Sequence, residues 1–262
     1  MQDILIVGNV TKDVYLRLDS HKNHFEKDQD GTEWLDLAFN GDTHKFFSRV
    51  AVFGGSAITK EVFTNFNINF SANLASTEQT PIHRYILCRG DAPHYFSPVE
   101  FTRNKWVEPK TPPNWIYLDR SANITIDFAN DLIYYLERFP KTKLVTFVHK
   151  YANINAPYFI ELIKKSTLII SDTKSNFPPH IQISNNRIFC QNSSLSWAKK
   201  EKENINTHLT ITQTLASTVF AALLRGNTVE KALKISVANL ELSTLNSTAS
   251  LEMIQQYIEE NR

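Results

Sequence analysis

The fold of this chain is constrained most by an alternation of short apolar runs with longer segments of helical periodicity. The apolar runs at 116–118, 143–147 and 167–171 are short enough to be buried strands, and helical patterns at 123–138 and 155–165 separate them. Strands connected through helices usually pair in parallel, with helices packed on both faces of the sheet. We therefore predict an α/β fold in which a mainly parallel central sheet lies between helical layers.

Both ends of the chain extend this pattern. A run at 3–10 is apolar on both faces, as expected of an interior strand, and a helical pattern follows at 56–66. A further strand is predicted near 187–191. The last three helices are predicted at 208–225, 228–245 and 250–260. One sheet thus takes strands from both halves of the chain, and we expect a single domain over 1–262.

Composition limits the functions that are open to the chain. With 262 residues, 42% of them hydrophobic, it is long enough to bury a sizeable core. A formal net charge of +1 gives no broad basic surface, so nucleic acid is not an expected partner. The apolar runs are short and no basic leader precedes one, which predicts no membrane anchor and a cytoplasmic location. Cys88 and Cys190 lie far apart without histidines at ligand spacing, so neither a disulfide framework nor a zinc site is indicated.

Three alternating segments, at 33–39, 85–88 and 95–101, do not fit the parallel sheet. They indicate antiparallel strands of a small lid, whose strands we place within 14–50 and 84–102. Four aromatic residues lie in the first part of the lid: Trp34, Phe39, Phe46 and Phe47. These side chains would either cover a cleft or join two copies of the chain into a homodimer.

Three motifs follow one another along the chain. GNVTKD comes after the first strand at 8–13, GGSAIT opens the first long helix at 54–59, and AALLRGNTVEKALKISVAN lies at 221–239. Together they resemble the ribokinase or PfkB family of carbohydrate and nucleoside kinases, and the order of lid strands and βα units agrees over nearly the whole chain. The resemblance implies a three-layer α/β/α sandwich with a β-strand lid and a site for a sugar or nucleoside between sheet and lid. It also implies ATP and Mg²⁺ as cofactors if the chain is an active kinase.

The substrate-binding half of the implied site is largely present. The resemblance places Asp13 where the family uses an aspartate to accept hydrogen bonds from substrate hydroxyls; a turn residue at a strand end is the alternative. Asn9 serves the turn first and the substrate second. Gly54 and Gly55 would let a substrate approach the backbone, or would only form a tight strand-to-helix turn. Thr59 stands where the family usually has an asparagine, so a hydroxyl remains there.

The phosphate-binding half is altered. Counting back from Gly226, the family's Gly-Ala-Gly-Asp motif falls on 210–213, which reads Thr-Ile-Thr-Gln. The glycines of that motif expose amides at a helix N-terminus to the transferring phosphate, and its aspartate is the general base. Thr210 and Thr212, at the positions of the cofactor-binding glycines, are β-branched and crowd the amides. Gln213 occupies the position of the base and cannot act as one, so we predict no catalytic residue.

Other positions of the nucleotide side leave alternatives open. Gln213 either orients water or substrate or is an exposed residue in the first turn of its helix. Asp172 either replaces the lost base or holds magnesium, or it only forms a turn. The resemblance makes Asn239 a candidate cofactor contact, because its helix borders the adenine pocket in the family; a core or surface asparagine is the alternative. No metal site is predicted, since the His- and acid-containing segment at 21–28 has no helical apolar pattern.

Two functional classes follow. The first is a small-molecule kinase that uses another base and another phosphate cradle. The second is a pseudokinase that keeps the fold and binds a ligand or a partner. Loss of a general base typically lowers a rate by about 100-fold to 10,000-fold, and loss of the anion site adds a comparable factor. The residues therefore favour the second class, while the resemblance favours the first.

Overall fold

The computed structural model describes thirteen segments of the chain and leaves the remaining residues undescribed. The segments are 3–18, 26–27, 33–34, 46–89, 92–96, 104–119, 121–148, 155–172, 180–184, 187–190, 193–196, 208–243 and 248–260. Only the backbone is described at 13–18, 26–27, 33–34, 46–52, 83–89, 92–96 and 208–210.

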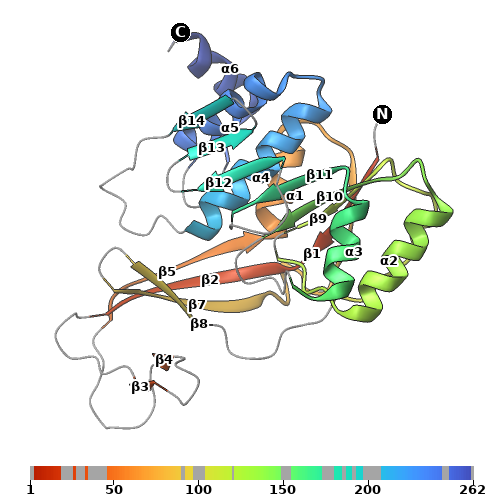
Figure 1. Cartoon of the computed structure of the whole chain (residues 1–262). Helices are drawn as coiled ribbons and strands as arrows, with labels where there is room; N and C mark the ends of the chain where they lie inside the picture. The colour runs from red at the N-terminus through yellow and green to blue at the C-terminus, as the bar shows by residue number, and fades with distance from the viewer. Residues whose placement is uncertain are drawn as a thin grey trace.

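An eight-stranded sheet forms the centre of the molecule (Figure 1), in the order β14-β13-β12-β11-β10-β9-β1-β6. Its strands are β1 Ile4–Gly8, β6 Phe70–Leu74, β9 Trp115–Leu118, β10 Lys143–Val148, β11 Leu168–Ser171, β12 Ile181–Ser184, β13 Arg187–Cys190 and β14 Ser193–Ser196. Every pair from β6 to β12 is parallel, and β13 and β14 continue the sheet as an antiparallel meander. The mainly parallel sheet predicted from the alternation of strands and helices is confirmed.

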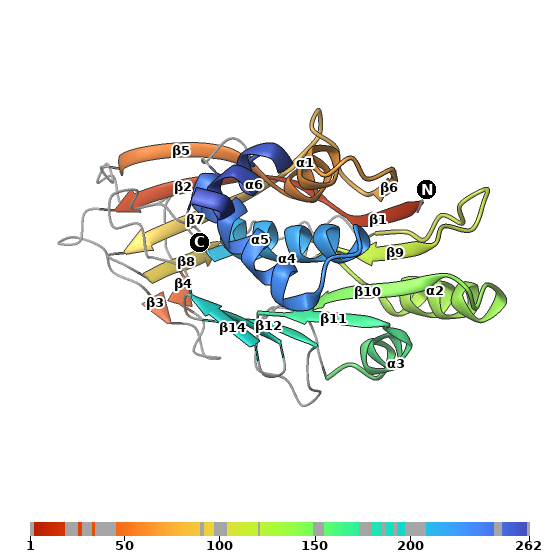
Figure 2. The same ribbon diagram turned by 90° about the horizontal axis from the view of Figure 1, so that it is seen from above.

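Six helices accompany the sheet within the described segments: α1 Ser56–Asn65, α2 Ile126–Arg138, α3 Pro157–Lys165, α4 His208–Leu224, α5 Val229–Leu242 and α6 Leu251–Glu260. The view from above (Figure 2) shows α2 and α3 on one face and α1, α4 and α5 on the other, with α6 beside α5. Thr125 and Thr228 cap α2 and α5, because each hydroxyl accepts a hydrogen bond from a first-turn backbone amide. No described helix is both long and apolar enough to cross a bilayer.

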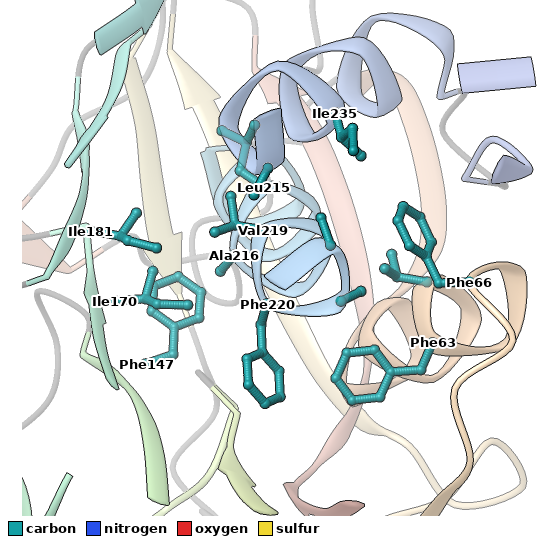
Figure 3. Packing of buried hydrophobic residues seen from close by; sticks show 14 of the residues in the cluster. Phe63, Phe66, Phe147, Ile170, Ile181, Leu215, Ala216, Val219, Phe220 and Ile235 are labelled. Atoms are coloured by element: carbon teal, nitrogen blue, oxygen red, sulfur yellow. The ribbon is translucent and has the colours of Figure 1, made fainter. Parts of the chain in front are cut away.

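Alternate residues of the central strands supply the two halves of the core. In β1, Ile4 and Ile6 pack toward α1 and α4, whereas Leu5 and Val7 pack toward α2, so both faces of the strand are buried. Helix α4 lies deepest, and every residue from 212 to 222 is buried. Figure 3 shows its apolar side chains Leu215, Ala216, Val219 and Phe220 beside the sheet residues Phe147, Ile170 and Ile181. The same burial holds the polar residues of α4 inside the molecule.

A second, four-stranded sheet stands apart from the first, in the order β5-β2-β7-β8. It comprises β2 Val10–Leu18, β5 Phe46–Gly55, β7 Ile82–Arg89 and β8 Ala92–Phe96, and a separate two-stranded pair joins β3 Glu26–Lys27 to β4 Glu33–Trp34. The predicted α/β sandwich with a small β-strand lid is thereby confirmed. Of the predicted segment 33–39 only β4 is described, and the segment 95–101 is described up to Phe96.

Candidate functional site

The candidate site lies where the central sheet and the small sheet meet. β1 ends at Gly8 and β2 begins at Val10, while β5 runs directly into α1 at Ser56. β9, the neighbour of β1, ends at Leu118 and is followed by Asp119. Because parallel strands end at the same edge of a sheet, these junctions converge, and this edge is where open α/β sheets bind ligands.

Asp119 is the centre of a buried polar network. Its side chain is 2% exposed and accepts four hydrogen bonds. The backbone amide and hydroxyl of Ser121 donate to Oδ1 at 2.8 and 2.6 Å. Thr59 Oγ1 and Gln213 Nε2 donate to Oδ2, each at 2.5 Å. The carboxyl therefore joins β9 to α1 and α4. Sequence reasoning missed this residue, although a polar residue directly after the buried run at 116–118 was a signal for it.

Burial raises the pKa of the Asp119 carboxyl above its usual value, and the hydrogen bonds from Ser121, Thr59 and Gln213 oppose this rise. Among the described residues no cation forms an ion pair with this carboxyl. Within the described part of the chain, hydrogen-bond donors stabilise its charged form. A carboxylate offers about four lone-pair positions, and the four donors occupy them.

Gln213 belongs to the same network, and the expectation that it is an exposed first-turn residue was wrong. It is 2% exposed and is the sixth residue of α4, which begins at His208. Its Nε2 contacts Thr59 Oγ1 at 2.6 Å as well as Asp119. One turn later, Ser217 Oγ donates to the Gln213 carbonyl at 2.8 Å and lies 2.9 Å from Thr59 Oγ1. The amide at the position of the family's base is thus held by internal partners.

The segment 210–213 does not fit a cradle for a triphosphate. α4 begins two residues before Thr210, and only the first four amides of a helix lack a partner within it. The amides of Thr212 and Gln213 are therefore committed to the helix, and the Thr212 side chain is 2% exposed. No group of three His, Cys, Asp or Glu residues able to hold a metal ion occurs in the described part of the chain.

Asn9 lies at the β1–β2 junction and is bound to the same loop as Asp119. Its backbone amide donates to Ser121 Oγ at 2.8 Å, and its Nδ2 donates to Ser121 O at 2.7 Å and to Asn104 Oδ1 at 3.0 Å. Asn104 in turn donates to Gly8 O at 2.8 Å, and its Oδ1 accepts a second bond from the Asn123 amide at 2.8 Å. Asn9 Oδ1 and Thr11 Oγ1 are buried and have no hydrogen-bond partner among the described residues. Their hydrogen-bonding capacity is unused within the described part of the chain.

Comparison with solved structures decides the fold, whereas the sequence matches no family model and no curated protein. The ribokinase of Arabidopsis thaliana in complex with ribose and ATP superposes with a TM-score of 0.63, over 98% of this chain and 99% of its own, at 10% identity. The nucleoside kinase of Methanocaldococcus jannaschii gives 0.61, at 11% identity over 99% of both chains. A ribokinase of Cryptococcus neoformans with ADP gives 0.64, at 10% identity over 99% of both.

This chain has the ribokinase fold. Similarity at this level of identity establishes the architecture of the chain and assigns no role to its residues.

Within this ribokinase fold, Gly55 at the start of α1 and Gly8 at the end of β1 are packed against the chain itself. Gly55 has φ +60°, and a Cβ there would lie 2.4 Å from Asn9 O and 2.9 Å from Ser121 Cβ. A Cβ at Gly8 would lie 2.3 Å from Ser56 Oγ. Gly54 pairs with Thr11 in the ladder of β2 and β5. Of the two alternatives for Gly55, the geometry favours a tight, closely packed turn.

Asp13, Thr210 and Asp172 are placed here by their backbone. Asp13 lies in β2, in register with Val52 and Arg84, but its side chain and that of Thr210 lie outside the described part. Asp172 follows β11, and its backbone amide donates to Val148 O at 3.1 Å. Their proposed contacts stay predictions.

Asn239 is 0% exposed and links three segments of the ribokinase fold. Its Nδ2 donates to Thr218 Oγ1 of α4 at 2.7 Å. Its Oδ1 accepts from the Ala249 amide at 3.0 Å and from Ser243 Oγ at 3.2 Å. Both ends of the side-chain amide are used inside the protein. This geometry favours the alternative of a core asparagine over contact with a cofactor.

Proposed function

We propose that this chain is a pseudokinase of the ribokinase fold, which binds a sugar or nucleoside between sheet and lid and does not transfer phosphate at a kinase-like rate. The observation that carries the proposal is the side chain of Gln213. At the position that the resemblance gives to the general base, it is a buried amide bonded to Asp119 and Thr59. An amide has no proton-accepting strength near neutral pH, so a substrate hydroxyl would not be activated there.

The altered start of α4 supports the loss of phosphoryl transfer independently of the base. Stabilisation of the transferring phosphate requires amides that point at it without another partner. In this chain the helix begins at His208, so the amides without a partner in the helix are those of 208–211, and the amides of Thr212 and Gln213 are bonded within the helix. Gln213 comes five positions after His208 in the helix, which corresponds to about 7.5 Å along the axis. An anion site and a substrate hydroxyl beside position 213 would thus be misaligned.

The β1–β2 junction supports the proposal that the chain still binds a ligand. Asn9 Oδ1 and Thr11 Oγ1 are buried without partners in the described part of the chain, which is costly unless something else bonds them. Ribose is bound by the Arabidopsis ribokinase, and the Methanocaldococcus protein is a nucleoside kinase. These two ligand classes are therefore the first to test.

An active kinase is the second candidate, and one observation favours it. The Asp119 carboxyl lies one hydrogen bond from the Gln213 amide, so an acid exists beside the position of the missing base. A substrate hydroxyl would have to displace Gln213 or Thr59 to reach it, because both side chains bond its Oδ2. The Asp119 carboxyl is therefore a poorer base than a carboxyl whose oxygens are free of internal hydrogen bonds.

Thermal-shift titration and a phosphoryl-transfer assay separate the two candidates. We expect ribose or adenosine to raise the melting temperature, because a ligand at 100 times its Kd adds about 2.7 kcal/mol of stability. We expect no rise with ATP and Mg²⁺, and no phosphorylated product from either ligand. Turnover that survives Asp172→Asn but disappears in Gln213→Ala would overturn the proposal, since position 213 would then take part in catalysis.

A further inference from the structure

The side-chain amide of Gln213 is oriented by its two neighbours. Its Nε2 lies 2.6 Å from Thr59 Oγ1 and 2.5 Å from Asp119 Oδ2, and the Thr59 hydroxyl donates to the same Oδ2. A carboxylate only accepts hydrogen bonds, and the one hydrogen of the Thr59 hydroxyl is already donated to it. Both neighbours therefore require a donor from position 213. The two hydrogens of an amide supply both bonds, so the nitrogen of the Gln213 amide faces this pair.

Burial keeps water away from this contact. Asp119 and Gln213 are each 2% exposed, and Thr59 is 0% exposed. The three residues come from three places in the fold, since Asp119 follows β9, Thr59 lies in α1 and Gln213 lies in α4. Ser217, one turn after Gln213, closes the contact from the side of α4, because its Oγ lies 2.9 Å from Thr59 Oγ1. Bulk water is thus not at hand to replace a lost donor or to screen an added charge.

A second carboxyl group at position 213 would meet the first one directly. Glutamate has nearly the shape of glutamine, so one of its oxygens would take the place of Nε2, beside Asp119 Oδ2 and Thr59 Oγ1. Two carboxylates at that distance cannot both be ionised, and one of them must bind a proton. Thr59 would at the same time lose the donor that it accepts from.

We infer that the junction of β9, α1 and α4 accepts one carboxyl group, that Asp119 supplies it, and that Gln213 is a positioning residue for this carboxyl. Position 213 is the one that the resemblance gives to the general base. An acid can therefore return to that position only when residue 119 is neutral. The inference goes beyond the proposed function, because it concerns an internal pair of side chains and holds whether or not the chain binds a ligand.

A double-mutant cycle on the full chain tests the pair, with Gln213→Glu, Asp119→Asn and the two substitutions together. We expect Gln213→Glu alone to lower the melting temperature by about 6 °C or more, because it leaves a buried charge without its donor. In the Asp119→Asn background the same substitution should cost less than half as much. The amide introduced at position 119 can then donate to the carboxylate introduced at position 213.

The relief by Asp119→Asn is the decisive measurement, since a residue that only fills space would not show it. Glutamate fills the space of glutamine in both backgrounds, so a packing role predicts equal losses. Equal losses, or a double variant that does not fold, would overturn the inference. A double variant that folds where Gln213→Glu alone does not would support it.

Gln256→Glu is the matched control. Gln256 also donates from Nε2 to a carboxylate, that of Glu260 at 2.7 Å, but both residues are exposed on α6. The same substitution therefore opposes two carboxylates in water, where like charges four positions apart cost little. We expect a fall in melting temperature of about 2 °C or less. A fall as large as that of Gln213→Glu would show that burial of the pair does not cause the effect and would overturn the inference.

Discussion

At the scale of single residues, the Asp119 carboxyl is the most unusual group described. It is buried, it has four donors, and no described cation pairs with it. Burial raises its pKa in the folded protein above the value in the unfolded chain. Between these two pKa values the folded state binds more protons than the unfolded state. The contribution of Asp119 to stability is therefore complete below the unfolded pKa and is lost as the pH rises through the folded pKa.

Asp119→Asn removes this titration, and the difference in unfolding free energy between wild type and variant should shrink as the pH is raised from acidic to neutral. Urea unfolding at a series of pH values measures it. Asp131→Asn is the control, because it makes the same substitution at an exposed position on α2, outside the network of Asp119. A difference that grows with pH would show that the four donors outweigh burial and hold the pKa of Asp119 below its usual value.

Residue positions were predicted better than residue partners. Counting back from Gly226 placed Gln213 at the position of the family's base, but its exposure was predicted wrongly. Its partners Thr59 and Asp119 are 154 and 94 residues away in the chain. No periodicity within α4 encodes such contacts, because they depend on where α1 and β9 end.

At the scale of elements, the start of α1 has a backbone conformation that requires glycine. Its N-cap Gly55 combines a φ of +60° with a ψ of −135°, a region that side chains rarely adopt. Gly226, after α4, also has a positive φ of +79°, but a Cβ there meets nothing within 4 Å. An alanine at position 226 would therefore suffer backbone strain alone, whereas an alanine at position 55 would suffer both backbone strain and steric overlap.

Gly55→Ala should destabilise the protein by about 3 kcal/mol or more, and Gly226→Ala by about 1 kcal/mol. Both variants lose the conformational freedom of glycine, but only the first places a Cβ 2.4 Å from Asn9 O. Chemical denaturation of the two variants measures the difference. Equal losses would mean that the β1–β2 junction yields to the added methyl group and is less rigid than its hydrogen bonds imply.

At the scale of the whole molecule, the arrangement of the lid sheet bears on assembly. β5 and β8 are its outer strands, and Phe53 of β5 is 46% exposed. An outer strand has unpaired backbone groups that can bond a second chain. Homodimer formation through the lid accordingly stays a prediction. Light scattering coupled to size-exclusion chromatography should give about twice the chain mass of 30.1 kDa. A monomeric mass at high concentration would contradict it.

The sequence by itself determined the helices and most central strands, because buried strands and amphipathic helices leave a local apolar pattern. The predicted helix at 208–225 is α4, His208–Leu224, for this reason. The strands β6, β12 and β14 were not predicted; β6, at the sheet edge, has exposed residues and no such pattern. Only the tertiary structure decided the site. Asn9, Thr59, Asp119 and Gln213 come from four segments, and their hydrogen bonds exist because the sheet brings the ends of β1 and β9 against α1 and α4.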